Sequence, residues 1–282
     1  MSEVMLEVRN LVKEFGVGRH TTRVLDDVNL TVHRGETVGL VGESGSGKST
    51  TARCALRLIE PTSGSVRFEG AEVLDFNRRK LKEYRSQVQM VFQDPYSSLD
   101  PRMYVEEIVA EGIRIHRPGM KRDAIRDEVV ELLELVGLRP EHLERRPAAF
   151  SGGQRQRIGI ARALAVKPRL LVCDEPVASL DVSIQAQILN LFADLRKRLG
   201  LTMLFIAHDL ATVRHLCDHI VVMQSGQVRE SGTREQVYGA PADPYTIALM
   251  EAVPEPDPIA ARKHSADRRA AARAVADNGV SA

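Results

Sequence analysis

The chain has 282 residues, a formal net charge of +1 at pH 7, 43% hydrophobic residues and 27% charged residues. This composition is ordinary for a soluble globular protein, and the length allows one large domain or two smaller ones with a real core. The small net charge excludes a global electrostatic preference for nucleic acid or acidic lipid. No stretch approaches the roughly 18 apolar residues of a membrane span, so we expect any membrane-spanning part to belong to a partner.

The first forty residues have the pattern of β-strands. Apolar residues recur at even spacing from Val24 to Val32, and Arg34-Gly35 marks a turn. The start, MSEVMLEVRN, has acidic residues and no long apolar run, so we do not interpret it as a signal peptide. The apolar run 37–41 is a further short strand that leads into a glycine-rich loop.

Helix and strand patterns then alternate. A helix is predicted from Lys48 to Ile59, ending near Pro61, and strands are predicted over 64–73 and 88–92. The character becomes helical from about 95 to 165. One face of a helix is indicated there by apolar residues spaced four, three and four apart, with Gly137 where the helix would end: Ile125, Val129, Leu132 and Val136.

The second half continues this alternation. Strands are predicted over 169–173 and 201–207, and between them runs a long helical stripe formed by Ile184, Ile188, Leu191, Leu195 and Leu199. The order predicts an α/β fold whose parallel sheet has helical crossovers, with the helical block as an insertion. After about 240, five prolines exclude a long helix, and we expect the last two dozen residues, rich in Ala, Arg and Asp, to be mobile or a short exposed helix.

A strand, the sequence GESGSGKS and a helix together form the context of a phosphate-binding loop. Glycines let the backbone turn so that N–H groups point at phosphates, and the following helix adds the positive end of its dipole. Lys48 is expected to bind the β- and γ-phosphates, and Ser49 to offer its hydroxyl to Mg²⁺. The predicted nucleotide contacts here are Gly42, Glu43, Ser44, Gly45, Ser46, Gly47, Lys48, Ser49 and Thr50.

Two adjacent acids, Asp174 and Glu175, follow the apolar run 169–173. Because carboxyl ends of parallel strands meet at one sheet edge, we expect both beside the phosphate loop. Asp174 is predicted to hold Mg²⁺, directly or through water, and Glu175 to orient or deprotonate the attacking water. Two acids on a bland surface would be solvated and inert, but the buried character of the preceding run favours the functional interpretation.

A third motif is formed by Ser151, Gly152, Gly153 and Gln154, at the start of a helical run. Ser151 is a suitable N-cap, and the glycines expose backbone N–H groups, which makes a second anion site. An ordinary helix cap explains these four residues equally well. We expect this motif to contact a phosphate held by another chain, because it is not expected to reach the loop of its own chain.

The combination of GESGSGKST, FSGGQRQR, LLVCDEP and a later His208-Asp209 resembles the nucleotide-binding subunits of ATP-binding-cassette (ABC) transporters, over roughly residues 4–235. The resemblance implies a P-loop ATPase core with a mixed or parallel sheet, an N-terminal antiparallel β-subdomain and an inserted α-helical subdomain at about 95–165. It divides the chain into a nucleotide-binding domain, 1–240, and a C-terminal extension with a mobile tail, 241–282.

The resemblance also assigns roles by position. Phe15 matches an aromatic residue that stacks on adenine, although a strand-end core residue would look the same. Gln93 matches a glutamine that touches the Mg²⁺ and water region and senses the membrane partner; by itself it is typical of a turn. His208 matches a histidine that contacts the γ-phosphate, and Asp181 lies in a loop that crosses the dimer interface. The residues before Leu-Asp are Ala178-Ser179, where the family more often has Ser-Ala.

Three longer segments resemble oligopeptide and dipeptide importer ATPases: VFQDPYSSLDPRM, EPVASLDVSIQAQILNL and DPYTIALMEAVPEPDP. Relatives that move nickel or glutathione share much of this pattern, so the cargo stays open. Some members continue into a Cys-rich segment that suggests an iron–sulfur site. The three cysteines here, Cys54, Cys173 and Cys217, are widely spaced and none follows Cys217, so we predict structural thiols and no cluster.

The implied protein is an ATPase that uses ATP and Mg²⁺ and powers peptide import. Its implied partners are a second ABC ATPase subunit (a homo- or heterodimer), two transmembrane permease subunits and, indirectly, an extracytoplasmic solute-binding protein, with no nucleic acid. It would lie peripherally on the cytoplasmic face of the inner membrane. A non-transport ABC ATPase acting on DNA or the ribosome, a regulatory nucleotide binder and a small-molecule kinase are the rival interpretations.

Overall fold

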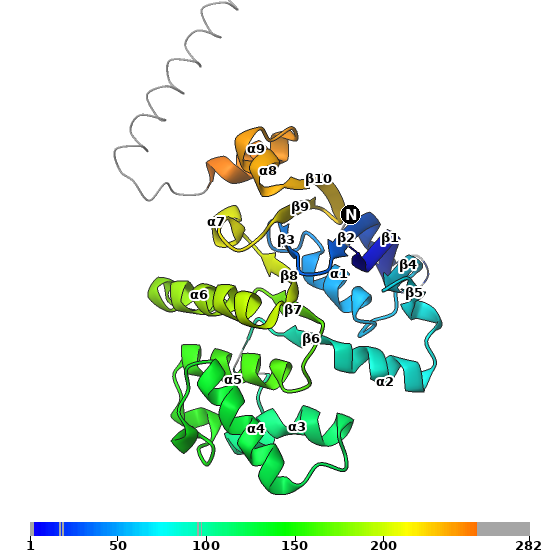
Figure 1. Cartoon of the computed structure of the whole chain (residues 1–282). Coiled ribbons are helices and arrows are strands. Elements are labelled where there is room, and N and C mark those ends of the chain that lie inside the picture. Colours follow the sequence, from blue (N-terminus) through cyan, green and yellow to red (C-terminus); the bar gives the residue numbers. More distant parts are fainter. Residues whose placement is uncertain (1–2, 17, 19, 95, 97, 253–282) are drawn as a thin grey trace, which may run out of the picture.

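The computed structural model describes residues 3–16, 18, 20–94, 96 and 98–252. The expected mobility or helix of the last two dozen residues lies outside this part. Two sheets carry the fold, and helices cover them, with the inserted helical part on one side of the larger sheet (Figure 1). No helix of the described ranges is long and apolar enough to cross a membrane.

The smaller sheet is antiparallel and has the strand order β2-β1-β4-β5. Buried and exposed residues alternate along its long strands, as expected for a sheet with one face on the core. This confirms the predicted N-terminal antiparallel sheet. Its strands are β1 (Val4–Phe15), β2 (Thr22–His33), β4 (Ser63–Phe68) and β5 (Ala71–Glu72).

The larger sheet is mixed, with the order β10-β9-β3-β8-β7-β6. Neighbouring strands from β9 to β6 are parallel, and β10 is antiparallel to β9. The strands β3, β7 and β8 are buried along their whole length, which explains why they read as continuous apolar runs. The bounds are β3 (Thr37–Val41), β6 (Val88–Val91), β7 (Leu170–Asp174), β8 (Thr202–Ala207), β9 (His219–Gln224) and β10 (Gln227–Thr233).

The first helix after the glycine-rich loop, α1 (Lys48–Ala55), ends earlier than the predicted Ile59. Arg57 has a positive φ of 49°, and its guanidinium donates to the carbonyls of Val73 and Phe76, so the chain leaves the helix there to meet the 3₁₀ turn η1 (Val73–Asp75). The left-handed conformation of Arg57 ends the helix, with the Leu58 amide bonded back to the Arg53 carbonyl at 2.8 Å, and no glycine or proline at this position indicated it in the sequence.

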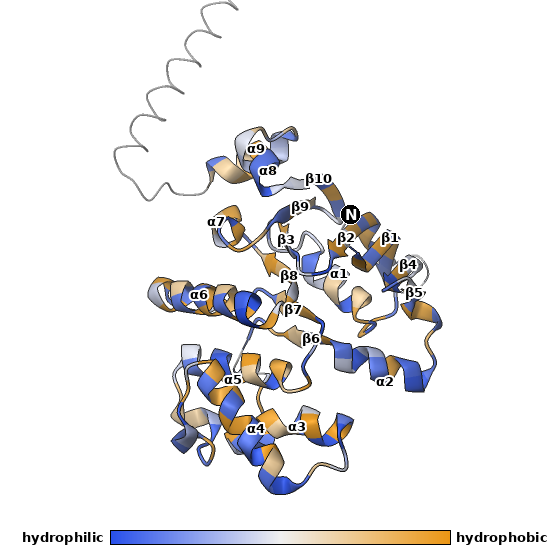
Figure 2. Ribbon diagram, in the orientation of Figure 1, coloured by the Kyte–Doolittle hydropathy of each residue, from blue (hydrophilic) through white to orange (hydrophobic). Residues whose placement is uncertain are grey.

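Helix α2 (Arg78–Gln87) was missed by the sequence analysis because it is mostly hydrophilic, as Figure 2 shows. The Asn77 side chain caps it by accepting from the Lys80 amide. Its one buried side chain, Tyr84, packs edge-on against Phe68 and Phe76. A single aromatic anchor therefore holds a helix that has no apolar stripe.

The inserted helical part lies between β6 and β7 and contains the helices α3 (Val105–His116), α4 (Arg122–Leu135) and α5 (Gly152–Leu164), with the 3₁₀ turns η2 (Pro140–His142) and η3 (Pro147–Ala149). The four predicted stripe residues of α4 are all buried, and Gly137 follows the helix with φ +75°. These expectations are confirmed.

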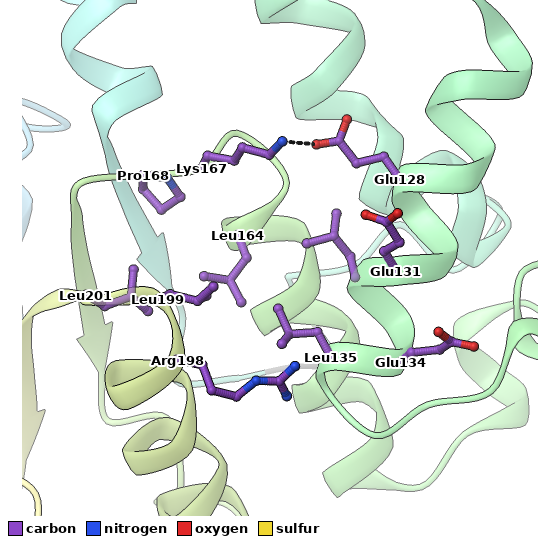
Figure 3. Close-up of a pocket in the computed structure, with 11 residues that line it drawn as sticks. Glu128, Glu131, Glu134, Leu135, Leu164, Lys167, Pro168, Arg198, Leu199 and Leu201 are labelled. Atoms are coloured by element: carbon purple, nitrogen blue, oxygen red, sulfur yellow. Dashed lines mark ion pairs between the residues drawn. The ribbon is translucent and has the colours of Figure 1, made fainter.

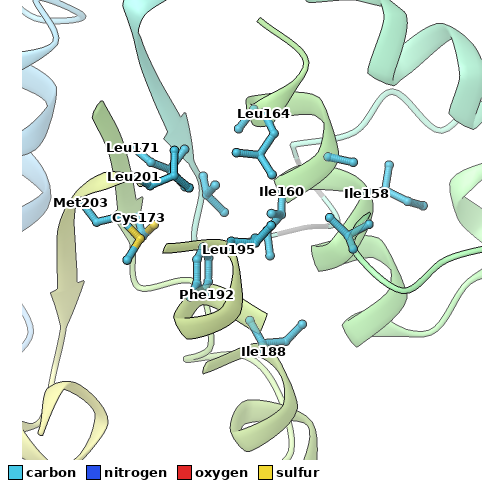
Figure 4. Close-up of a cluster of buried hydrophobic side chains, with 14 of the residues drawn as sticks. Ile158, Ile160, Leu164, Leu171, Cys173, Ile188, Phe192, Leu195, Leu201 and Met203 are labelled. Carbon is cyan, nitrogen blue, oxygen red and sulfur yellow. The ribbon is translucent and has the colours of Figure 1, made fainter. Parts of the chain in front are cut away.

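The stripe predicted on α6 (Val182–Leu199) is confirmed only in part. Ile188 and Leu195 are buried together with Phe192 (Figure 4). The Phe192 ring packs edge-on against Phe205 of β8. Leu199 is instead 47% exposed, because it lines a groove of about 630 Å³ between the helical part and the core. Figure 3 shows this groove, with leucines at its floor and the Glu128–Lys167 ion pair of 3.0 Å across its rim.

Three short helices complete the described chain, and two of them follow β10: α7 (Leu210–Val213), α8 (Arg234–Gly239) and α9 (Pro244–Glu251). The shortness of α9 agrees with the prolines around it. Cys54, Cys173 and Cys217 are free and buried, and burial raises the pKa of all three thiols, to about 11 at Cys54.

Candidate active site

The carboxyl edge of the larger sheet gathers most of the predicted site residues. Four neighbouring parallel strands end there side by side: β3 leads into the loop 42–47, β8 into His208, β7 into Asp174-Glu175, and β6 toward Gln93. Segments far apart in the sequence therefore meet because parallel strands present the same end at one edge.

The loop 42–47 follows β3 and starts α1. Gly42 has φ +152°, and a Cβ on it would lie 2.1 Å from the Met223 carbonyl oxygen, so this position accepts only glycine. The Gly226 amide donates to the Ser46 carbonyl at 2.9 Å, so the turn after β9 supports the loop from behind. The loop is thereby held as a tight turn in front of a helix N-terminus, where backbone amides favour an anion.

Lys48 lies almost entirely buried, with 3% of its side chain exposed. Its ammonium group donates to the carbonyls of Gly42 at 2.7 Å and Glu43 at 2.8 Å, and lies 3.6 Å from Glu175 Oε1. Burial lowers the pKa of Lys48, and the Glu175 charge opposes that effect. The positive charge is thus fixed within the turn of the loop, next to the acids.

Ser49 and Asp174 form a second contact between loop and sheet. The Ser49 hydroxyl donates to Asp174 Oδ1 at 2.6 Å, and Arg53 lies 3.9 Å from Oδ2. Burial raises the pKa of Asp174, while the Ser49 bond and Arg53 lower it. A hydroxyl and one carboxylate are oxygen ligands of the kind that Mg²⁺ takes together with waters and substrate phosphates, so this pair fits the ion.

Glu175 has a positive φ of 44° directly after β7, and its amide donates to the Ile206 carbonyl at 3.2 Å. Gln93 donates its side-chain N–H to Glu175 Oε2 at 2.9 Å. The backbone carbonyl of Gln93 accepts from the Ser179 hydroxyl at 3.5 Å. The structure therefore joins three predicted residues in a row, from Lys48 through Glu175 to Gln93, with Glu175 oriented from both sides.

His208 lies at the same sheet edge and is half exposed, with Nε2 3.2 Å from Asp209 Oδ2. The Asp209 carboxylate also caps α7 by accepting from the Thr212 amide at 2.7 Å, so the acid beside His208 is fixed. Within the described ranges, no hydrogen bond links His208 to Glu175. The structure brings the histidine to the edge but not into the row of bonded residues.

The Ser-Gly-Gly-Gln motif begins α5. The Ser151 hydroxyl accepts from the Gln154 amide at 3.4 Å, and the Ser151 amide donates to Gln154 Oε1 at 3.0 Å, which forms a capping box. A Cβ on Gly153 would lie 2.5 Å from Ile184 Cγ2, so the glycine lets α5 approach α6 closely. In the part of the chain that the structure describes, no hydrogen bond joins this motif to the loop 42–49.

Two further predicted residues lie apart from this row. Phe15, at the end of β1, is 44% exposed, and the Lys13 ammonium lies 4.8 Å from its ring centroid. Asp181 is exposed at the N-cap position of α6 and makes no side-chain capping bond. Both side chains are therefore accessible to a ligand or to a partner chain.

Sequence reasoning missed one neighbour of the loop. Tyr245 of α9 accepts a hydrogen bond from the Glu43 amide at 3.2 Å. The only signal was the Asp-Pro-Tyr-Thr run, which suggested a C-terminal extension but not its place beside the loop.

Comparison with known families decides the identity of the fold. A family model described as ABC transporter matches residues 25–178, which is more than half of the chain. The chain belongs to the ABC transporter family of ATP-binding proteins. Its mixed sheet, antiparallel sheet and helical insertion are those expected for an ABC ATPase, so the predicted fold class is confirmed.

Relatives and solved structures agree with this membership. This ABC ATPase is 51% identical over 259 residues to the oligopeptide transport ATP-binding protein OppF of Bacillus subtilis, covering 92% of this chain and 85% of that protein. It is 51% identical over 267 residues to the dipeptide transport ATP-binding protein DppF of Lactococcus lactis subsp. cremoris, covering 93% and 85%.

Among solved structures, the dimeric ATP-binding cassette MJ0796 in a post-hydrolysis state bound to ADP and Pi is similar, with a TM-score of 0.74 and 31% identity over 82% of this chain and 99% of that one. ATP binding and hydrolysis are accordingly the activity of this family member.

Proposed function

We propose that this ABC ATPase hydrolyses ATP to power the import of peptides by a membrane transporter. The hydrolytic part is supported by the bonded row of Lys48, Glu175 and Gln93 at the sheet edge. The cargo is supported by two relatives that are named for oligopeptide and dipeptide transport. Each aligns with more than nine tenths of this chain at 51% identity.

In this proposal the loop 42–50 holds the phosphates of ATP. The Lys48 ammonium exchanges part of its hydrogen bonding to the Gly42 and Glu43 carbonyls for bonds to the β- and γ-phosphates. The backbone amides of the loop and the α1 dipole add to the binding. Ser49 and Asp174 hold Mg²⁺, with Gln93 nearby. The ion supplies charge neutralisation on the phosphate oxygens when it is bound.

Glu175 acts as the general base for hydrolysis. One water is oriented by the Glu175 carboxylate and attacks the γ-phosphorus; its proton passes to the carboxylate as the bond to the ADP oxygen breaks. The Gln93 amide and the Lys48 ammonium on its two oxygens fix the direction of the carboxylate, which favours this transfer. His208 contacts the γ-phosphate from the neighbouring strand end.

Two chains complete each site, head to tail. The capping box leaves the first amides of α5, at Gly152 and Gly153, as anion donors for a γ-phosphate held by another chain, and Ser151 and Gln154 contact the same group. Asp181 lies in the loop that crosses the interface, and Phe15 stacks on adenine. A two-fold axis then gives two equivalent sites.

Permease subunits dock on a groove of about 640 Å³ between β6, α3 and α5. Its rim carries three exposed or half-exposed apolar side chains, Leu58, Phe92 and Ile115, which suit an apolar cytoplasmic segment of a permease. The segment after Gln93 is tied to α5 by the Arg162 bond to the Ser98 carbonyl and by Arg155, 4.1 Å from the Tyr96 ring centroid. When the γ-phosphate next to Gln93 is lost, the resulting movement of Gln93 is therefore transmitted both to the groove and to α5.

The full assembly contains two such ATPases, identical or paralogous, two permeases and a solute-binding protein on the far side, with this chain peripheral on the cytoplasmic face. Reconstitution of that assembly in liposomes tests the proposal. We expect peptide-loaded binding protein to stimulate phosphate release. If only nickel or glutathione complexes stimulated phosphate release, the proposed peptide cargo would be wrong. If hydrolysis did not respond to any permease, the proposed role in transport would be wrong.

A further inference from the structure

The C-terminal extension touches the phosphate loop. The Glu43 amide, second in the loop, donates to the Tyr245 hydroxyl at 3.2 Å, across 202 residues of sequence. This amide is directed toward α9, so the phenol holds the start of the loop and takes up none of the amides from Ser44 to Gly47.

Helix α9 is firmly anchored, so Tyr245 does not hang from a loose tail. The Glu230 carboxylate of β10 accepts from the amides of Ala242 at 2.9 Å and Asp243 at 3.1 Å. The Asp243 side chain in turn accepts from the Tyr245 amide at 2.7 Å and caps the helix. Thr246 is fully buried, and the ring of Tyr245 packs against the larger hydrophobic core.

We propose that Tyr245 is a positioning residue for the phosphate loop, through which the C-terminal extension sets the affinity for ATP. Gly42, directly before the bonded amide, has a backbone conformation that few residues adopt, and the Lys48 ammonium that holds this start of the loop through the Gly42 and Glu43 carbonyls turns toward the phosphates when ATP binds. The Tyr245 bond restrains that start. A loop already in its binding conformation loses less freedom when ATP arrives, and affinity rises accordingly.

This inference rests on the proposed ATP site, and the test separates the two. Tyr245→Phe removes only the hydroxyl and keeps the ring in the core. We expect the Kd for MgATP to rise about three- to tenfold, the usual consequence of losing one neutral hydrogen bond. The kcat at saturating ATP should stay unchanged, because the acids are not altered, and the Tm of the nucleotide-free protein should fall by no more than the loss of one neutral hydrogen bond allows.

Tyr238→Phe is the matched control. Its hydroxyl donates to the Leu210 carbonyl at α7 and not to the loop, so ATP affinity should be retained. Glu43→Pro removes the amide donor itself, and in that background Tyr245→Phe should have no further effect. Should Glu43→Pro fail to fold, the two phenylalanine variants carry the comparison alone.

Equal ATP affinity in wild type and Tyr245→Phe, or equal losses in both phenylalanine variants, overturns the assignment of Tyr245. Additive losses for Glu43→Pro and Tyr245→Phe overturn it as well, since the effects would then be independent. A wild-type protein that binds no MgATP contradicts the proposed function itself, whatever the variants do.

Discussion

Replacing Glu175 by glutamine is the sharpest perturbation of the hydrolytic step. The glutamine has the same shape and its oxygen still accepts from Gln93, whose N–H lies 2.9 Å from the carboxylate. What disappears is the proton acceptor and its charge. We expect turnover to fall about 10²- to 10⁴-fold, the usual effect of a positioned general base, which corresponds to about 2.7–5.4 kcal/mol in the activation barrier.

ATP affinity should survive this change. The Lys48 ammonium lies 3.6 Å from Glu175 and is almost fully buried, so the substitution leaves a buried positive charge without its carboxylate. The phosphates of ATP supply the missing negative charge. Bound ATP that is not hydrolysed should also hold the two chains together, so a closed dimer should accumulate.

The assay is phosphate release under single-turnover and steady-state conditions, beside equilibrium binding of MgATP and size-exclusion chromatography. Glu131→Gln removes the same charge from the exposed surface of α4 and should leave all three readouts at wild-type values. Near-normal turnover by Glu175→Gln would take Glu175 out of the role of base.

Three more outcomes follow from the site. Lys48→Met should weaken ATP binding by about tenfold or more, since charge-assisted bonds to phosphate are lost; titration with a fluorescent ATP analogue measures this, and unchanged affinity contradicts it. Burial raises the pKa of Asp174, so the folded chain binds more protons than the unfolded chain between the two pKa values, and the unfolding free energy falls as pH rises through that window. Asp174→Asn should abolish this fall, raise the Tm of the nucleotide-free protein at neutral pH and stop Mg²⁺-dependent hydrolysis; a lowered Tm would contradict the burial argument. Gly153→Ala places a Cβ 2.5 Å from Ile184 Cγ2 and should cost about 1–3 kcal/mol of stability, recovered when Ile184→Ala is added; thermal unfolding without that recovery places the strain elsewhere.

The sequence predicts well where a local pattern decides the structure. The continuous apolar runs at β3, β7 and β8 fixed the buried strands, and their order fixed the parallel sheet. Because parallel strands share an edge, the closeness of Asp174 to the phosphate loop followed from order alone, and the 2.6 Å bond from Ser49 agrees with it.

Where distant contacts decide, the local pattern gives no warning. The polar helix α2 is held by Tyr84 against two other rings, and α1 ends early at the left-handed Arg57, whose side chain bonds to the carbonyls of Val73 and Phe76 after β5. Leu199 continues an apolar stripe but lies where the helical part leaves a groove. The bond between Glu43 and Tyr245 joins segments that no periodicity relates.

The capping box at Ser151 is a case in which the structure of one chain does not test the predicted role. Its geometry is that of a good helix cap, and the roles of Ser151, Asp181 and Phe15 toward a second chain stay predictions drawn from the family resemblance. In the proposed head-to-tail dimer, each chain supplies one half of two different sites, so the geometry of a single chain does not test these roles.

Mixing two inactive variants tests that shared site most directly. In a head-to-tail dimer, Lys48→Met on one chain and Ser151→Arg on the other fall in the same site and leave the second site intact. The test requires a wild-type protein that hydrolyses ATP without its membrane partners. An equal mixture of the two variants should then regain about a quarter of wild-type turnover, since half of the dimers are mixed and each mixed dimer has one intact site of two. No recovery on mixing, or full activity of Ser151→Arg by itself, would contradict a site built from two chains.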